Sequence, residues 1–408
     1  MRPPFSFRHL TFPAVVAGFV AVLVGYTSSA AIIFQAAGAA GASDLQIGGW
    51  LSMLGLAMGL TSLGLSLYYR APILTAWSTP GAALLVTSLP GTPIAEAVGV
   101  FIFASALIFL CGVTGLFARL MNYIPQAISA AMLAGILLRF GLDAFGALKL
   151  NFTLTASMCL IYLLAKRFLP RYAIVLTLIA GLLVAGFSGE IHFSHQPLSF
   201  TLPQFISPHF TLSTLLGIGI PFFVVTMASQ NAPGIATLKA AGYQVPVSPL
   251  ISWTGLASLL LSPFGGFSVC IAAITAAICM GPDVHPDPKR RYWGAACAGF
   301  FYLIAGLFGG AIGQLFSALP PALIHTIAGL ALLGTIAGSL QRALADESQR
   351  EAAVITFLIT ASGLSLLGVG AAFWGLAGGV IAHLIFSLPG KKWDEVDACE
   401  FRFTSSTH

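Results

Sequence analysis

A short polar interruption lies within an otherwise apolar stretch, where residues 76–83 read AWSTPGAA. Pro80 suits the first turn of a helix, because the N–H that proline lacks would have no partner there. Ser78 or Thr79 suits the preceding N-cap position. The first amides of a helix lack intrahelical partners, and the aligned peptide dipoles give that end a partial positive charge. The stretch therefore predicts a half-helix whose start could hold a small anion.

A second interruption echoes the first in the other half of the chain. When Trp77 is aligned with Phe267, WSTPGAALLVTSLPG overlies FSVCIAAITAAICMG. Ser78 then meets Ser268. The stretch GGFS at 265–268 is accordingly expected to start another half-helix, which would point back at the first.

Hydroxyl and amide side chains in two further segments complete the candidate site. When Ser28 is aligned with Ser229, GYTSSAAIIFQAAGAAG overlies TMASQNAPGIATLKAAG. Pro233 removes a backbone donor and predicts a kink beside the amides. The alternative role for each polar residue is a helix–helix hydrogen bond. The expected substrate-binding residues are Tyr26, Ser28, Trp77, Ser78, Thr79, Gln230, Asn231, Phe267 and Ser268.

The chemical character of this site suits one class of ligand. Its positive potential would come from peptide amides rather than from Lys or Arg, while Trp77 and Phe267 would supply apolar walls. A small, flat anion such as an aromatic carboxylate would fit it better than a sugar or a polyphosphate.

The composition decides what kind of fold positions these residues. Of 408 residues, 57% are hydrophobic and only 8% are charged, with a mean hydropathy of +0.93. Soluble domains carry roughly a quarter charged residues. The chain is therefore expected to be an all-α integral membrane protein.

Several other classes of function are excluded by missing patterns. No basic cluster interleaves with aromatics, which argues against nucleic-acid binding. The six cysteines form no close CxxC pair, so we expect neither a disulfide framework nor a metal site. HExxH and GxSxG motifs are absent as well. We expect no enzyme activity and no cofactor.

Helices that cross a membrane need about 20 apolar residues. Twelve candidate spans and two shorter segments, polar at their starts, make fourteen elements. The spans lie near 13–37, 47–69, 94–115, 125–142, 151–168, 171–187, 211–231, 248–262, 292–316, 320–340, 352–369 and 373–389, and the short segments are 76–89 and 267–280.

The placement of basic residues supports fourteen crossings. With the N-terminus in the cytoplasm, 16 of the 18 basic residues fall in inside segments, and only Arg139 and Lys149 fall outside. This is a strong positive-inside bias. It predicts that both termini are cytoplasmic.

The two self-alignments place element one over eight and element three over ten. They predict a seven-plus-seven organisation, and because seven is odd the second half must run inverted. Inverted repeats with paired, interrupted segments are typical of secondary transporters. Chance similarity between small-residue helices that pack closely is the alternative.

Ionisable residues within spans are scarce. Asp143 follows Arg139 by four residues in LLRFGLDAF, so the two can pair on one helix face. Such a pair is either functional or a self-neutralising pair near the outer surface. His325 and His383 are interpreted as packed, hydrogen-bonded residues rather than as proton carriers.

Six stretches resemble the bacterial benzoate transporter family, BenE: GYTSSAAIIFQAA, LTAWSTPGAALL, CGVTGLFARLMNYIP, AAMLAGILLRFG, VTMASQNAPGIATLKAAGY and FYLIAGLFGG. The resemblance implies a symporter that moves benzoate inward with a proton across the bacterial inner membrane. It also implies fourteen segments in inverted repeats, related to nucleobase and sulfate/bicarbonate transporters. The implied core domain is 10–122 plus 211–318, the gate domain is 123–210 plus 319–390, and the cytoplasmic tail is 391–408.

One departure from these relatives bears on the substrate. The nucleobase transporters use glutamates in elements eight and ten, whereas MASQNAPG and GGFSVCIAA contain no acid. Their absence suits an anionic substrate and leaves the proton-coupling group unassigned. The expected partners are a small aromatic carboxylate, a proton and membrane lipid, and the relatives make a homodimer plausible. An anion channel or uniporter on the same scaffold is the alternative function.

Overall fold

The computed structural model describes residues 10–117, 125–192, 203–282, 284–364, 366 and 371–388, and the predicted tail 391–408 lies outside this part. Nearly all of the described chain is helical. The longer helices are α1 (Phe12–Ala39), α2 (Asp44–Tyr69), α4 (Ile94–Thr114), α6 (Gln126–Gly146), α7 (Phe152–Phe168), α8 (Ala173–Phe187), α12 (Val247–Leu261), α14 (Tyr292–Leu307), α15 (Gly309–Ala318), α16 (Pro321–Leu344), α17 (Arg350–Ala361) and α18 (Ala371–Phe386).

Two regions are interrupted. The first holds strand β1 (Thr75–Trp77) and helix α3 (Thr79–Ser88), and the second holds strand β2 (Val269–Ile271) and helix α13 (Ile274–Met280). A long segment between them alternates α-helical and π-helical turns. It comprises α9 (Leu212–Thr214), a π turn at Leu215–Gly219, α10 (Ile220–Thr226), a π turn at Met227–Asn231 and α11 (Ala232–Ala240).

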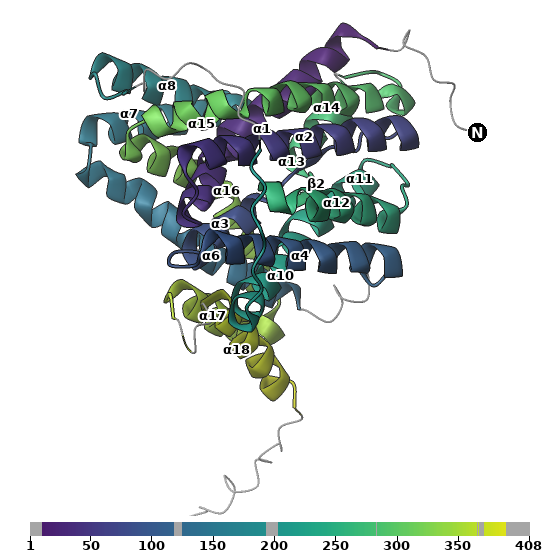
Figure 1. The fold of residues 1–408 in the computed structure, drawn as a ribbon, viewed down its shortest axis with the longest axis vertical. Coiled ribbons are helices and arrows are strands. Elements are labelled where there is room, and N and C mark those ends of the chain that lie inside the picture. The colour runs from purple at the N-terminus through teal and green to yellow at the C-terminus, as the bar shows by residue number, and fades with distance from the viewer. Residues whose placement is uncertain are drawn as a thin grey trace, which may run out of the picture.

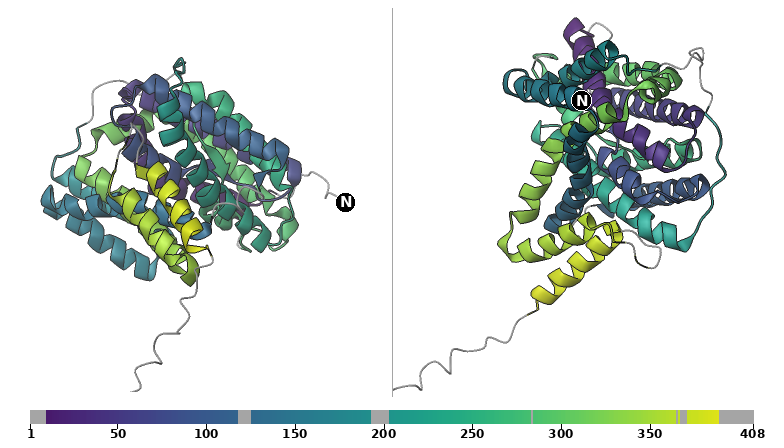
Figure 2. Two further views of the ribbon diagram at one scale, coloured as in Figure 1. Left: turned by 90° about the horizontal axis from the view of Figure 1, so that it is seen from below. Right: turned by 90° about the vertical axis from the view of Figure 1, so that its left-hand side faces the viewer.

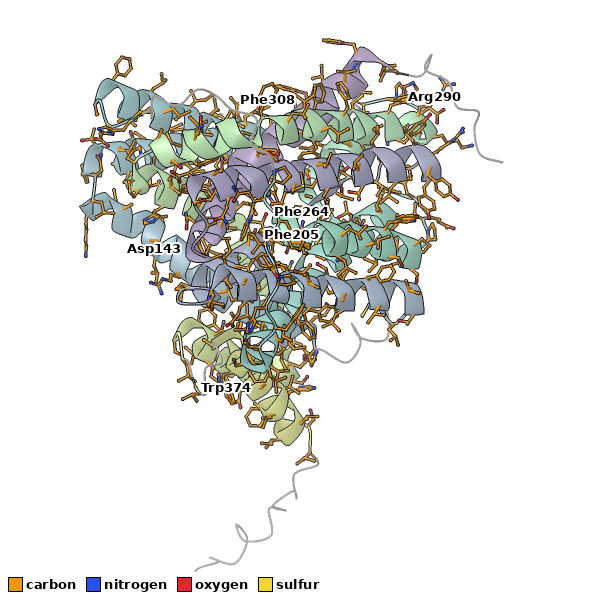
Figure 3. The ribbon with its side chains drawn as sticks, viewed as in Figure 1. Asp143, Phe205, Phe264, Arg290, Phe308 and Trp374 are labelled. Carbon is orange, nitrogen blue, oxygen red and sulfur yellow. The ribbon has the colours of Figure 1, made fainter. Side chains whose placement is uncertain are left out.

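Seven helical stretches within the described residues are long and apolar enough to cross a membrane: Phe12–Ala39, Asp44–Tyr69, Ile94–Thr114, Gln126–Lys149, Leu212–Lys239, Val247–Phe264 and Pro321–Leu344. An eighth is counted if α14 and α15 form one span. The predicted span 292–316 is divided between these two helices, because the chain bends by 66° where they meet. Phe308 lies at the bend (Figure 3), and the glycines that follow it permit the turn.

Helix α17 covers only the first part of the predicted span 352–369. Helix α17 ends at Ala361, and Gly363 adopts a left-handed conformation with φ of 68°. A residue without a Cβ adopts this conformation freely and commonly terminates helices. With 12 residues, α17 is only about 18 Å long, which is too short to cross a bilayer.

The helices pack as two neighbouring groups. In the first group, α14, α2, α12 and α4 lie side by side in a stack, as Figure 1 shows, and α1 crosses behind them. In the second group, α6 packs against α16 and α17, and α7 packs against α8. Figure 2 shows α17 and α18 at the end of the molecule away from α14.

Close approach of backbones explains the contact between α2 and α14. A Cβ on Gly55 would lie 2.6 Å from the Cα of Gly306, and one on Gly299 would lie 2.7 Å from the amide nitrogen of Leu63. Lipid tails are as apolar as leucine, so membrane helices gain from close van der Waals contact through small residues. Larger side chains at these glycines would force the two helices apart.

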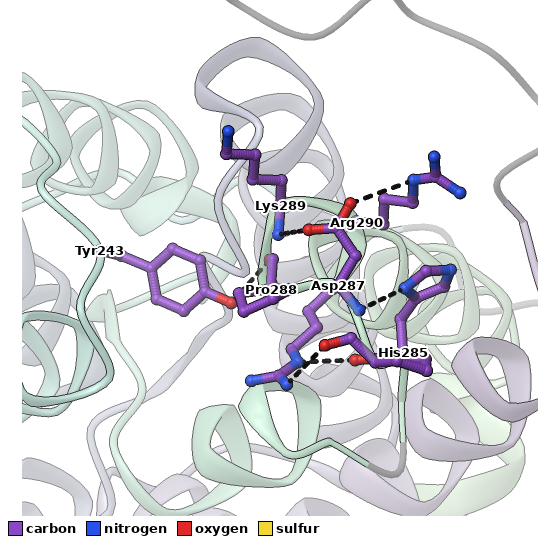
Figure 4. A network of polar contacts seen from close by, with 8 residues as sticks. Tyr243, His285, Asp287, Pro288, Lys289 and Arg290 are labelled. Atoms are coloured by element: carbon purple, nitrogen blue, oxygen red, sulfur yellow. Dashed lines mark hydrogen bonds and ion pairs between the residues drawn. The ribbon is translucent and has the colours of Figure 1, made fainter.

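A polar loop holds the end of α13, and Figure 4 shows its contacts. The Arg291 guanidinium donates to the carbonyl oxygens of Met280 at 2.9 Å and His285 at 2.8 Å. Tyr243 donates from its hydroxyl to the Pro288 carbonyl at 2.9 Å. Burial raises the pKa of this tyrosine, which keeps it a neutral donor. The carbonyl of Met280, the last residue of this short helix, therefore gains a cationic partner.

Candidate functional site

The two interrupted regions meet in a two-stranded antiparallel ladder. Thr75 pairs with Ile271, and Trp77 pairs with Val269. Next to the ladder, the Ser78 N–H donates to the Ser268 carbonyl at 3.1 Å. The expectation that the interruptions lie together is confirmed, although they belong to opposite halves of the sequence.

Strand β1 has an outer edge that hydrogen-bonds to helix α2. The Thr75 N–H donates to the Ser62 hydroxyl at 2.9 Å, and the Trp77 N–H lies 3.1 Å from the Met58 sulfur. A backbone N–H inside a bilayer must find a protein partner, because no lipid tail can accept from it. Helix α2 therefore supplies the acceptors that this short strand needs inside a membrane.

Strand β2 is held in the same manner on its own outer edge. The Val269 N–H donates to the Ser258 hydroxyl of α12 at 2.7 Å, and the Ile271 N–H donates to the Asn231 amide oxygen at 2.9 Å. Asn231 is fully buried, and its amide nitrogen lies 3.3 Å from the Met227 sulfur. The amide oxygen and the amide nitrogen of this predicted binding residue therefore both have partners within the protein.

Helix α3 begins where the sequence predicts. Ser78 is its N-cap and accepts from the Gly81 N–H at 3.0 Å, while Thr226 donates to the Ser78 hydroxyl at 3.3 Å. Pro80 follows in the first turn. With 10 residues, α3 is about 15 Å long, half of what a full crossing needs.

The prediction of a helix start at 265–268 is wrong. Gly265 is left-handed after a turn of 3₁₀-helix, and Ser268 has a φ of 56° just before strand β2. Helix α13 begins only at Ile274 and has seven residues and no side-chain cap. Pairing with β1 takes the residues that the self-alignment assigns to a first helical turn. That alignment therefore pairs Ser78 with a residue of different structural role.

The two predicted aromatic walls lie in different surroundings. The Trp77 indole N–H donates to the Ser29 hydroxyl of α1 at 2.7 Å, and its ring lies 4.8 Å from that of Tyr26. Phe267 is fully buried and stacks on Phe101 with a centroid distance of 4.8 Å. Phe267 is therefore part of a buried aromatic cluster, whereas Trp77 is buried against helix α1.

The remaining site residues divide by exposure. Tyr26, Ser28, Thr79 and Gln230 are half-buried, whereas Trp77, Ser78, Asn231, Phe267 and Ser268 are buried. Within the described part of the chain, Gln230 and Thr79 make no side-chain hydrogen bond, and the buried Tyr26 hydroxyl has no partner. The Ser28 hydroxyl instead bonds the Gly25 carbonyl at 3.1 Å.

These half-buried groups come from elements that converge on the ladder. Helix α1 packs against both α3 and α13, and the π turn Met227–Asn231 packs against α3 and β2. These elements therefore bring uncharged hydroxyl and amide groups toward the ladder and helix α3. In the described residues, no group of three or more His, Cys, Asp and Glu side chains could hold a metal ion.

The serines that hold the strands were not among the predicted site residues. Ser62 and Ser258 occupy equivalent positions in GLTSLGLS (59–66) and GLASLLLS (255–262). Six of the eight positions in these two stretches are identical. This match is a stronger repeat signal than the alignment of Trp77 with Phe267. It aligns strand β1 with residues 271–273, two residues beyond the observed strand β2.

Comparison with known proteins gives two kinds of relative. A family model described as benzoate membrane transport protein, BenE, matches residues 8–385. The inner membrane protein YdcO of Escherichia coli is 57% identical over 92% of this chain and 96% of its own length. The benzoate membrane transport protein of Acinetobacter baylyi is 41% identical over 92% of this chain and 95% of its own.

Solved structures of similar fold are more distant in sequence. The SLC26A9 structure is 13% identical with a TM-score of 0.64, and this chain covers 66% of its length. The transmembrane domain of the cyanobacterial bicarbonate transporter BicA is 14% identical with a TM-score of 0.55, and this chain covers 99% of it. These likenesses show a shared helical fold.

Proposed function

Because this chain belongs to the benzoate membrane transport family, BenE, we propose that it carries benzoate, or a close aromatic carboxylate, into the cell together with a proton. The protein is a multi-pass transporter of the inner membrane and not an enzyme. Its transport would be secondary, driven by the proton gradient, with both termini in the cytoplasm. An anion channel or uniporter on the same fold is the second candidate.

The proposed architecture has fourteen segments in two inverted repeats of seven. Helix α1 and the stretch Leu212–Lys239 each have 28 residues, and α2 and α12 hold equivalent strands through equivalent serines. The packing groups support a core of 10–122 plus 211–318 that moves against a gate of 123–210 plus 319–390. Inverted repeats that rock around a central site are the usual basis of alternating access.

One observation carries the proposed binding site: α3 begins inside the protein, with its capped N-terminus beside the strand ladder. No acidic or basic residue occurs in β1, the first turn of α3 or the π turn Met227–Asn231. A helix start carries roughly half a positive charge, which favours an anion over a neutral base. We place the substrate carboxylate near Thr79 and Gln230, with its ring toward Tyr26.

Purified protein in proteoliposomes tests this function. An inward proton gradient should drive labelled benzoate to a higher concentration inside than outside, and a proton ionophore should abolish the accumulation. Uptake that only equilibrates would favour the channel or uniporter. No uptake of any kind would contradict the assignment to benzoate.

Gln230→Ala tests the placement of the substrate. Loss of one hydrogen bond to an ionised ligand should weaken benzoate binding roughly tenfold, about 1.4 kcal/mol, without lowering the melting temperature. The matched control is Gln314→Ala, since Gln314 is half-buried on α15 and lies outside the site. Equal affinity in both variants would remove Gln230 from the binding site.

A further inference from the structure

An apolar groove lies between α2 and α12, which are neighbours in the helix stack of Figure 1. The groove has a volume of about 650 Å³. Small residues leave this space open, since Ala57, Gly64 and Ala257 line the groove and a Cβ on Gly64 would meet nothing within 4 Å. The gap between the two helices is therefore a site that another molecule can enter.

The large apolar side chains that line the groove are exposed. Leu60 and Leu260 are 55% and 62% exposed, and Tyr68 and Trp253 are 61% and 55% exposed. Both helices belong to stretches that are long and apolar enough to cross a membrane, so these side chains face the bilayer. Apolar cavities do not hold water. Inside a membrane, the occupant of the groove is therefore a hydrocarbon chain or a helix of another protein chain.

The dimensions of the groove favour a hydrocarbon chain. Residues 57–69 of α2 line its length, which is about 18 Å at 1.5 Å per residue. The volume spread over this length gives a mean cross-section of about 36 Å², whereas a helix about 10 Å wide has a cross-section of about 80 Å². A helix of a second copy is too wide to enter the groove, and an extended acyl chain fits along it.

One end of the groove has the features of a membrane–water interface. Tyr68, Tyr69 and Trp253 line the groove there, and Tyr and Trp are enriched where hydrocarbon meets lipid headgroups. Arg70 follows Tyr69 directly, and Lys239 is exposed at the end of α11, shortly before α12 begins. Within the described part of the chain, neither basic residue makes an ion pair. Unpaired basic residues at a membrane surface attract anionic headgroups.

The groove also touches residues that support the strand ladder. Thr61 lines the groove, and its hydroxyl lies 2.7 Å from the Thr75 hydroxyl of β1. Leu261 lines it from α12, and the Leu261 carbonyl accepts from the Gly266 N–H at 2.8 Å, three residues before β2. An occupant of the groove therefore contacts both helices close to the points where they hold the two strands.

We propose that this groove binds one acyl chain of an anionic phospholipid and that the bound lipid holds α2 and α12 together. The chain gains van der Waals contact along both helices. The headgroup lies at the aromatic end, where Arg70 and Lys239 supply the positive charge. The lipid thereby stabilises the two helices that carry the ladder. This binding does not depend on which substrate the protein carries.

Native mass spectrometry of the purified full-length protein counts the phospholipids that it retains. Wild-type protein stripped of lipid and titrated with phosphatidylglycerol should bind one molecule per chain and melt at a higher temperature. Phosphatidylethanolamine with the same acyl chains has no net charge and should bind at least several-fold more weakly. Equal binding of the two lipids would overturn the assignment of an anionic headgroup, and a wild type that binds neither would overturn the site.

Gly64→Leu tests where the lipid binds, because a leucine side chain would fill the groove. This variant should lose the bound phosphatidylglycerol and the rise in melting temperature that the lipid causes. The matched control is Gly334→Leu, since Gly334 is an exposed glycine of α16 whose added Cβ also meets nothing within 4 Å. Ala257→Leu fills the groove from the opposite helix and replaces Gly64→Leu if that variant does not fold. Lipid binding as strong in the groove variants as in the control would overturn the proposal.

A second copy of this chain is the alternative occupant, and the same spectra test it. The proposal expects the groove variants to change the number of bound lipids and to leave the oligomeric state as it is in the wild type. A wild-type dimer that separates into monomers in Gly64→Leu and Ala257→Leu, but not in Gly334→Leu, would make the groove a subunit interface and overturn the lipid site.

Discussion

The two interrupted regions follow one plan, yet they differ at the helix that comes after the strand. In each copy, a long helix ends, a residue in a left-handed conformation closes its last turn, and a three-residue strand comes later. The closing residue is Arg70 in the first copy and Gly265 in the second, where Ser268 is left-handed as well. Beyond the strands, α3 has ten residues and a serine cap, whereas α13 has seven residues and no side-chain cap.

This difference indicates that the ladder and the helix starts have separate roles. The ladder is nearly symmetric, because each strand needs the same hydrogen bonds wherever it lies in the bilayer. The helix starts are unequal, and of these two only the one at α3 has a cap that fixes its amides. We infer that one copy serves mainly for binding and the other mainly for support.

The largest difference in stability is expected between substitutions at Gly265 and at Arg70, the left-handed residues that close the two long helices. In Gly265→Ala, a Cβ would overlap the Trp50 indole and strain the backbone at a φ of 85°, which should cost at least about 2 kcal/mol. In Arg70→Gly, relief of a φ of 52° should cause no loss of stability. Melting temperatures in detergent measure both changes.

The control for this pair is Gly64→Ala, because a Cβ on Gly64 meets nothing within 4 Å. Its melting temperature should not fall. If Gly265→Ala melted like this control, tight packing of the second copy would not be the reason for glycine there.

A smaller difference in stability is expected between the contacts of Asn231 with β2 and of Met58 with β1. Asn231→Leu leaves the Ile271 N–H without an acceptor in an apolar interior, which should cost about 1–3 kcal/mol. Met58→Leu removes only a weak sulfur acceptor from Trp77 and should cost less than half as much. Thermal unfolding compares the two, and equal losses would show that the amide of Asn231 has no special structural role.

The strand serines should behave alike. Ser62→Ala and Ser258→Ala each remove the acceptor for one strand N–H, and each should cost about 1 kcal/mol. The two losses should agree within about 0.5 kcal/mol, and the double variant should show whether the strands weaken each other, since paired residues are rarely additive. A loss at one serine alone would contradict a symmetric ladder.

The start of α3 was predictable from the sequence because its signals are local. Ser78 and Pro80 stand at the positions that N-caps and first turns favour, and both preferences act within one helical turn. The positions of most long helices are also predictable, because a run of about 20 apolar residues is itself a signal within one stretch of sequence. The early end of α17 depends on the left-handed conformation of Gly363, which composition alone does not specify. The 66° bend at Phe308 is likewise not specified by composition.

The second strand was not predictable in the same way. Residues 269–271 become a strand because they pair with β1, which lies in the other half of the chain, and because Ser258 and Asn231 bond their outer edge. None of these partners is a local signal. Asn231 illustrates the consequence for the site: its residue type suited a ligand, but its oxygen is committed to a strand N–H.

The smallest expected effect concerns Ser268 in the second copy. Its φ of 56° costs a residue with a Cβ about 1 kcal/mol, while its carbonyl accepts from the Ser78 N–H. Ser268→Gly should keep that backbone bond and raise the melting temperature slightly. Benzoate affinity should stay unchanged, because the fully buried Ser268 side chain lies 3.4 Å from the Cys270 sulfur. A fall in benzoate affinity without a fall in melting temperature would place the Ser268 hydroxyl at the substrate. Both interrupted regions would then contact the substrate.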